Sequence, residues 1–170
     1  VHKIIKEWEN LRHELPYETD GVVIKVNQSS LREQLGTTSK FPRWAIAYKF
    51  EAEQATTFIN DITLQVGRLG TITPVAELEA VELAGTTVKR ASLHNEDEIQ
   101  RKDIRIGDTV VVEKAGEIIP QVISVVNPDS ADRNEPYTFP KNCPACDSEL
   151  IKYEDEVAWR CVNPTCPPQV

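Results

Sequence analysis

Two lysines are candidates for phosphate chemistry, because each lies in a short and otherwise apolar segment. Lys25 occurs in the segment D-G-V-V-I-K-V at residues 20–26, and Lys49 occurs in W-A-I-A-Y-K-F at residues 44–50. A lysine among buried apolar side chains is costly unless its ammonium group finds an anion. Two such lysines on neighbouring strands could direct two ammonium groups at one phosphate.

Both segments are typical of short, mostly buried strands, since they are rich in β-branched and aromatic residues. Side chains alternate between the faces of a strand, so Lys25 shares a face with Val23, and Lys49 shares one with Ala45 and Ala47. The small alanine side chains would leave room for a ligand. The alternative is that each lysine extends from a strand edge into water, which is the usual behaviour of a single lysine.

Four cysteines near the end of the chain have the spacing of metal ligands. Cys143 and Cys146 are separated by two residues, fourteen residues follow, and Cys161 and Cys166 are separated by four. Four thiolates in two pairs suit a tetrahedral structural zinc site that has no open position. The alternative is two disulfides in a secreted chain. Nothing else in the sequence suggests secretion, so we predict zinc.

Composition limits the class of protein. The chain has 170 residues, of which 40% are hydrophobic and 27% are charged, a normal balance for one or two soluble domains. No apolar run approaches the ~20 residues of a membrane span, and no signal-peptide pattern occurs at the start. The chain begins at Val1 and contains no methionine. We therefore expect it to be an internal part of a longer protein.

The net charge of −8 argues against a basic surface over the whole molecule. A local basic patch is still compatible with that charge, because binding depends on where the charges lie. Between Lys25 and Lys49 the anion Glu33 stands alone against five cations, which are Lys25, Arg32, Lys40, Arg43 and Lys49.

The remaining sequence supplies elements that could position these residues. Apolar residues recur at helical spacing over residues 3–14, and Pro16 marks the end of that predicted helix. A second short helix and a loop are predicted over residues 28–43. From Thr56 onward the pattern predicts five strands, at residues 57–66, 72–81, 88–93, 109–114 and 118–126.

One helix is predicted between the third and fourth of these strands. Asn95 is a suitable N-cap, Glu98 follows three residues later, and the helix should end near Lys102. Five strands with a helix in this position describe an OB-fold barrel, although strand periodicity alone permits another small barrel. Residues 127–142 are rich in Pro, Asp, Ser and Asn, which predicts a linker.

The two lysine segments resemble the last two nucleotidyltransferase motifs of bacterial NAD-dependent DNA ligases. The resemblance continues in order through V-G-R-L-G-T-I-T-P at residues 66–74, A-S-L-H-N at 91–95, R-I-G-D at 105–108 and K-A-G-E-I-I-P at 114–120, and then reaches the cysteines. It covers nearly the whole chain. One departure is Leu69, where this family commonly has threonine.

The resemblance implies a mainly β fold with some α. Residues 1–52 would form the C-terminal edge of a nucleotidyltransferase (adenylation) domain, which is an ATP-grasp-like α+β domain. Residues 53–128 would form a five-stranded OB-fold barrel, and residues 129–170 a linker and a small four-cysteine zinc finger. The family selects the OB-fold over other barrels.

The resemblance also implies roles for single residues. Lys25 and Lys49 would bind the nucleotide phosphates and take part in catalysis, and Asp20 would lie beside the phosphates and help to hold Mg²⁺ or Mn²⁺. Arg12 would help to bind the nucleotide, although a solvated arginine at a helix end is the plain alternative. Arg68 and Lys114, each close to a glycine, would contact the DNA backbone; the alternative is two solvated surface cations.

The function implied is sealing of nicks in duplex DNA, with NAD as adenylate donor and zinc as a structural ion. The resemblance also implies a monomer in the bacterial cytoplasm, at the nucleoid, with no membrane partner. Family ligases use the lysine of a K-x-D-G motif as nucleophile, but here Glu18 stands two residues before Asp20 and no other Asp-Gly pair occurs. We therefore expect this chain alone to be inactive.

Two other classes explain parts of the sequence. A non-enzymatic nucleic-acid-binding module, made of an OB barrel and a zinc ribbon, accounts equally well for residues 53–170 but not for the paired lysine segments. A structural or interaction fragment is supported mainly by the acidic charge balance.

Overall fold

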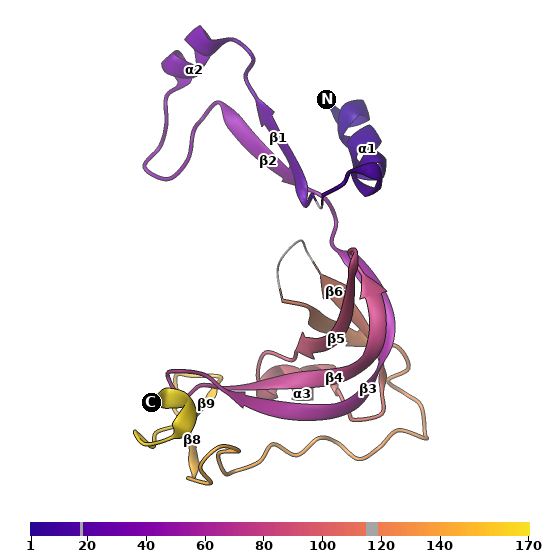
Figure 1. Ribbon diagram of the computed structural model, residues 1–170, viewed down its shortest axis with the longest axis vertical. Coiled ribbons are helices and arrows are strands. Elements are labelled where there is room, and N and C mark those ends of the chain that lie inside the picture. Colours follow the sequence, from indigo (N-terminus) through magenta and orange to yellow (C-terminus); the bar gives the residue numbers. More distant parts are fainter. Residues whose placement is uncertain (18, 115–118) are drawn as a thin grey trace. The chain divides into compact units, whose positions relative to one another are not determined.

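The computed structural model describes residues 1–17, 19–114 and 119–170. The chain divides into two compact units, Val1–Ala52 and Glu53–Val170. Strands dominate the described residues, and three α-helices accompany them (Figure 1). The expectation of a mainly β fold with some α is confirmed. None of the described helices has the length and apolar character needed to cross a lipid bilayer.

The first unit contains two helices and one pair of strands. Helix α1 (His2–Leu11) continues into a short 3-10 turn, η1 (Arg12–Glu14), and α2 (Ser29–Leu35) lies between the strands β1 (Gly21–Lys25) and β2 (Ala45–Lys49). The strands pair antiparallel, with Gly21 opposite Lys49 and Lys25 opposite Ala45. The helices and strands predicted for this part of the sequence are therefore present.

The prediction that these two strands are mostly buried is wrong. Val23 and Ile46 keep 60% and 67% of their surfaces exposed, and every described residue of β2 is at least partly accessible. An apolar strand is buried only where other segments of the polypeptide pack over it. A two-stranded sheet with two short helices has too little material within its own unit to cover both faces.

The second unit is built on a closed five-stranded barrel. Its strands are β3 (Glu53–Val66), β4 (Ile72–Leu83), β5 (Thr86–Ser92), β6 (Thr109–Lys114) and β7 (Gln121–Val125), and they follow the order β3-β4-β5-β7-β6 around the barrel. The five predicted strands are confirmed, although β3 begins earlier than predicted. Residues 115–118, which include the predicted start of the last strand, lie outside the described residues.

Strand β3 is long because it pairs with two partners in succession. Residues 53–58 pair with β6, residues 59–66 pair with β4, and the register shifts between Ile59 and Asp61. This change of partner bends the strand and closes the barrel. The residues that point inward form one apolar core, whose fully buried members include Ile59, Ala76, Val110, Val112 and Val122.

Helix α3 (Glu96–Lys102) lies between β5 and β6, as predicted, and buries Ile99 in the barrel core. The Asn95 side chain accepts a hydrogen bond from the Glu98 amide at 2.9 Å, so the predicted N-cap is confirmed. The Glu98 carboxylate pairs with Arg101 and Lys102, while the Asn95 amide donates to the carbonyl of Leu93. The cap is therefore one-sided, unlike a full capping box.

Residues 127–142 contain no helix or named strand, but they are fixed to the barrel rather than free. Arg133, with only 7% of its side chain exposed, donates to both oxygens of Asp108 at 2.9 and 2.8 Å and to Asp103 at 2.7 Å. The Asn134 amide donates to the carbonyl of Ile106 at 2.7 Å. The composition of this segment predicted its irregular backbone. It could not predict that Arg133 would pair with residues far away in the sequence.

The last part of the chain forms a small finger on the tip of the β3–β4 hairpin (Figure 1). It contains β8 (Leu150–Lys152), β9 (Trp159–Cys161) and the 3-10 turn η2 (Pro167–Gln169). Its core includes Ile72 from the hairpin, and Leu64 and Val66 pack against it. The other buried members of this core are Phe139, Cys143, Leu150, Cys161 and Cys166.

Replacing Arg133 with Ala should strongly destabilise the barrel unit. The Asp108 carboxylate, with 3% of its side chain exposed, would lose its main cationic partner. Loss of one member of a buried ion pair typically costs about 3–5 kcal/mol of unfolding free energy. Arg90→Ala removes an exposed pair with Glu77 and should cost at most about 1 kcal/mol. Urea denaturation of both variants provides the measurement, and equal losses would contradict the assignment.

Candidate functional site

The antiparallel register places Lys25 and Lys49 on one face of the β1–β2 pair, at its opposite ends. Lys25 lies opposite Ala45, Lys49 lies opposite Gly21, and Val23 and Ala47 occupy the centre of the same face. Four residues of strand separate the lysines, or about 14 Å at ~3.4 Å per residue. Both side chains are exposed. Their ammonium groups could meet only through an anion located between them, above Val23 and Ala47.

One end of this face already carries a charge pair. The Lys49 ammonium lies 2.5 Å from a carboxylate oxygen of Asp20, and both side chains are accessible. The hydrogen bond and the charge of Lys49 hold the pKa of Asp20 below its ordinary value. Asp20 therefore remains a carboxylate and offers the hard oxygen ligand that Mg²⁺ prefers. Among the described residues, Lys25 has no hydrogen-bond or ion-pair partner, which leaves its charge available to a ligand.

The glycine after Asp20 has a packing role as well as a place in the motif. A Cβ atom on Gly21 would lie 2.3 Å from the carbonyl oxygen of Tyr48. The Phe50 amide donates to the carbonyl of Asp20 at 2.9 Å, which closes this end of the strand pair. Only glycine allows β1 and β2 to approach closely here, and this approach brings Asp20 within reach of Lys49.

Arg12 is not gathered with the two lysines. Its guanidinium group lies over the ring of Phe50, 5.1 Å from the ring centre, in a cation–π interaction. Phe50 follows Lys49 directly, so its side chain faces the other side of the strand pair. The role of Arg12 in nucleotide binding remains a prediction.

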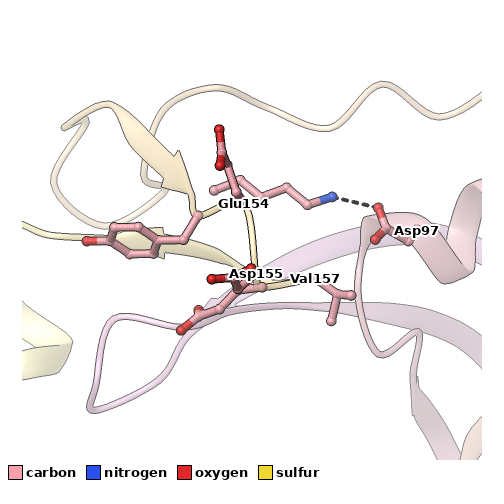
Figure 2. A pocket seen from close by; sticks show the side chains of 7 residues that line it. Asp97, Glu154, Asp155 and Val157 are labelled. Carbon is pink, nitrogen blue, oxygen red and sulfur yellow. Dashed lines mark hydrogen bonds and ion pairs between the residues drawn. The ribbon is translucent and has the colours of Figure 1, made fainter.

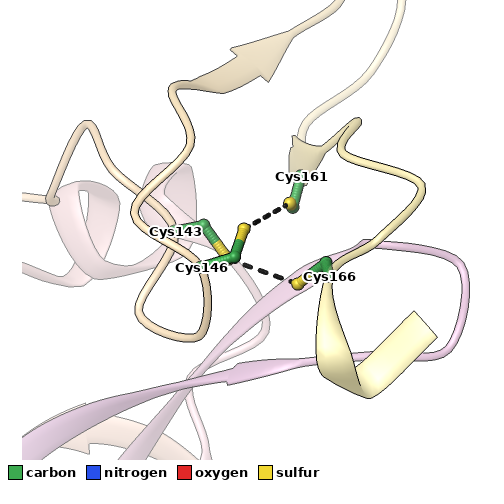
Figure 3. A group of neighbouring side chains, drawn as sticks. All are labelled: Cys143, Cys146, Cys161 and Cys166. Carbon is green, nitrogen blue, oxygen red and sulfur yellow. Dashed lines mark hydrogen bonds between the residues drawn. The ribbon is translucent and has the colours of Figure 1, made fainter. Parts of the chain in front are cut away.

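The four cysteines converge on one point (Figure 3). Their sulfur atoms all lie within 4.8 Å of one another, with Cys143 and Cys166 separated by 3.8 Å and Cys146 and Cys161 by 3.5 Å. A zinc ion bound at ~2.3 Å to four sulfurs in a tetrahedron separates each sulfur pair by about 3.8 Å. All four are free thiols, and these distances are far longer than a disulfide bond. The donor set fits structural zinc.

The surroundings of the sulfurs explain why a cation is needed. Burial raises the pKa of the Cys166 thiol to about 12, whereas hydrogen bonding with Ser148 lowers the pKa of Cys146 to about 6. Four adjacent thiolates would repel each other strongly in this buried position. A bound divalent cation would hold all four in the deprotonated form and so contribute directly to the folding energy of the finger.

The two candidate DNA contacts lie at opposite ends of β3 rather than in one patch. Arg68 lies in the turn after β3 and is exposed, with no hydrogen bond or ion pair to any residue that the structure describes. Lys114 ends β6, opposite Glu53 at the start of β3, and its ammonium group donates to the Thr86 hydroxyl at 2.8 Å. Any duplex that touches both would have to extend along the barrel.

Contacts that join the finger to the barrel were not found by sequence reasoning. The Lys152 ammonium lies 2.6 Å from a carboxylate oxygen of Asp97 on α3, the residue labelled in Figure 2. The Trp159 indole donates to Glu96 at 2.8 Å. These partners are 55 and 63 residues apart in sequence, and no local pattern connects them. The pocket beside Lys152 is lined by Glu154, Asp155 and Glu156, so its acidity disfavours DNA phosphate there.

Comparison with known proteins decides the family. Residues 1–53 match the NAD-dependent DNA ligase adenylation domain, residues 56–135 match the NAD-dependent DNA ligase OB-fold domain, and residues 142–167 match the NAD-dependent DNA ligase C4 zinc finger domain. The chain belongs to the NAD-dependent DNA ligase family. The barrel is accordingly an OB-fold, and its matched region includes Arg133.

Individual relatives agree with this ligase family. The DNA ligases of Bacillus cereus (strain B4264) and Bacillus thuringiensis (strain Al Hakam) are each 58% identical to the chain over 166 residues. The match covers 98% of this chain and 25% of each relative. The chain thus spans about a quarter of the length of the curated relatives it matches.

The Asp20–Lys49 pair can be tested by titration. Replacing Lys49 with Ala should raise the pKa of Asp20 back toward the ordinary aspartate value, because the hydrogen bond and charge that lower it are both removed. Lys40→Ala, in the loop before β2, should leave that pKa unchanged. Carboxyl carbon shifts followed by NMR against pH provide the measurement. An identical Asp20 titration in wild type and Lys49→Ala would exclude the pair.

Removal of zinc should unfold the finger and loosen the hairpin tip beneath it. A chelator is expected to release about one zinc per chain, with loss of order over residues 141–170. Because Leu64 and Ile72 pack against the cysteine cluster, amides near the β3–β4 turn should also exchange faster. The rest of the barrel should survive. Metal analysis and hydrogen exchange test this expectation, and thiol titration that finds two disulfides and no metal would refute it.

Proposed function

We propose that this chain is part of an NAD-dependent DNA ligase that seals nicks in duplex DNA. The observation that carries the proposal is that consecutive parts of the chain match three domains of one enzyme, in order. In the proposed reaction a lysine attacks the α-phosphate of NAD and releases nicotinamide mononucleotide. AMP then passes to the 5′-phosphate of the nick, and the 3′-hydroxyl displaces AMP as the strand is sealed.

Within this scheme the β1–β2 face binds the phosphate that is transferred. Lys25 and Lys49 approach it from the two ends of the face and neutralise the charge that develops on its oxygens. Asp20 would help to hold Mg²⁺ or Mn²⁺, which would supply further charge neutralisation. When a nucleotide arrives, Lys49 can exchange part of its contact with Asp20 for the phosphate. Arg12 would contact a part of the nucleotide other than this phosphate, because it lies beside Phe50 on the other side of the strand pair.

The chain does not carry the attacking lysine in this proposal. Glu18 occupies the position two residues before Asp20, where the family motif has the nucleophile, and a carboxylate cannot form a phosphoramidate. Lys25 and Lys49 are exposed and serve as charged phosphate ligands, whereas a nucleophilic lysine must be deprotonated. We therefore infer that the nucleophile belongs to a part of the protein outside this chain, and that the chain alone is inactive.

The remaining residues hold the DNA. We divide the chain into an adenylation part (1–52), an OB-fold (53–128), and a connecting segment with the zinc finger (129–170). The barrel and finger grip the duplex around the nick, and Arg68 and Lys114 contact its phosphates. The ligase acts as a monomer in the bacterial cytoplasm, at the nucleoid.

Nick sealing by the full-length protein tests the proposal. Lys25→Ala and Lys49→Ala should each lower the single-turnover sealing rate about 10²–10³-fold, the usual cost of losing one preorganised charge at such a site. Lys6→Ala, an exposed lysine on α1, is the matched control and should seal at the wild-type rate. Circular dichroism confirms that each variant is folded. A wild-type rate in a folded Lys25 or Lys49 variant would remove that lysine from the mechanism.

A further inference from the structure

The finger and the β3–β4 turn are joined by direct backbone contact. Thr71 forms an isolated bridge with Arg160 of β9, and the Cys161 amide donates to the carbonyl of Gly70 at 2.9 Å. Gly70 has a φ of +78°, and a Cβ atom on it would lie 2.2 Å from the carbonyl oxygen of Cys161. Cys161, one of the four zinc-site cysteines, is therefore hydrogen-bonded directly to the turn that carries Arg68.

Arg160 connects this turn to the finger through its side chain. One guanidinium nitrogen donates to the Thr71 hydroxyl at 3.2 Å and lies 3.4 Å from the carbonyl oxygen of Leu69. The Glu156 carboxylate holds the other edge of the guanidinium at 2.5 and 3.2 Å. The charge of Arg160 is thus already paired within the finger, so Arg160 is poorly suited to bind a phosphate itself.

The side chains of Arg68 and Leu69 are exposed to solvent. Leu69 keeps 80% of its surface exposed, and Arg68 is exposed with its charge unpaired among the residues that the structure describes. The backbone beneath them is well held, since the Gly67 amide donates to Thr71 at 2.8 Å and the Gly70 amide donates to Gly67 at 2.9 Å. A rigid turn that presents one free cation suits a phosphate contact, because little order is lost on binding.

We propose that Arg160 is a positioning residue that holds the turn at residues 67–71 so that Arg68 meets a phosphate of the duplex. The finger then supports DNA binding through the barrel turn that it orders, while the acidic residues 154–156 disfavour a phosphate contact by the finger itself. This inference rests on the proposed DNA-binding function. It extends that function by assigning a task to Arg160 and, through Cys161, to the zinc site.

The test uses the 170-residue chain loaded with zinc, in wild-type form and as Arg160→Ala, Arg68→Ala and the double variant. Without DNA, Arg160→Ala should speed hydrogen exchange at Gly67 and Gly70 while the barrel core stays protected. With a nicked duplex, Arg160→Ala should weaken binding about five- to tenfold, because the turn must then be ordered during binding. Arg68→Ala should lower the log–log salt slope by about one unit.

The double variant separates positioning from direct contact. If Arg160 acts only by placing Arg68, then Arg160→Ala should leave DNA affinity almost unchanged in the Arg68→Ala background. An equal loss of DNA affinity in both backgrounds would show that Arg160 contacts DNA independently and would overturn the proposal. Arg101→Ala, which removes an exposed arginine paired with Glu98, is the control and should alter neither exchange at the turn nor the coupling.

Two further outcomes remain decisive. If Arg160→Ala releases its zinc, Arg160→Lys carries the test, because it keeps the charge but cannot bridge Glu156 and the turn at once. The Arg160→Lys variant should speed hydrogen exchange at Gly70 while it retains stoichiometric zinc, and unchanged exchange would overturn the proposal.

If the wild-type chain binds no duplex, the proposed DNA-binding function itself fails. Hydrogen exchange without DNA still decides whether Arg160 holds the turn.

Discussion

Packing of the β3–β4 hairpin tip against the cysteine cluster is the contact on which the zinc finger depends. The finger has about thirty residues, too few to build a sufficient core of their own. It completes that core with Ile72, Leu64 and Val66 from the barrel, and the barrel in turn receives a cover for the end of its longest hairpin. The metal, the finger and the hairpin therefore form one cooperative body, and a change at any of them reaches the other two.

The first unit obeys a different constraint, the antiparallel register of two short strands. Because Gly21 lies opposite Lys49 and Lys25 lies opposite Ala45, the two lysines share a face but occupy its ends. The same register brings Asp20 to Lys49, and only a glycine at position 21 permits the close approach. An anion above the centre of the face would draw both ammonium groups inward. The geometry thus favours a ligand that spans the face over one bound at a single lysine.

Local signals predicted most of the fold. Alternating apolar residues gave the barrel strands, Asn95 marked the start of α3, and the cysteine spacing anticipated a four-sulfur cluster. Burial of β1 and β2 was predicted wrongly, because an apolar strand does not reveal how much chain covers it. The contacts of Arg133 and Arg160 were also missed. Their partners are up to 30 and 91 residues away, and a single arginine in a polar segment looks the same whether it is anchored or free.

The acidic balance of the chain is compatible with DNA binding once the positions of the charges are considered. Many carboxylates are already paired internally: Asp103 and Asp108 with Arg133, Glu98 with Arg101, Asp97 with Lys152, and Glu156 with Arg160. A paired carboxylate contributes little field at a distance, and charges separated by more than about 10 Å are largely screened at ~0.1 M salt. Arg68 and Lys25 are exposed cations with no ion-pair partner among the described residues. For a phosphate close to either cation, the attraction of that cation outweighs the repulsion from the net charge of −8.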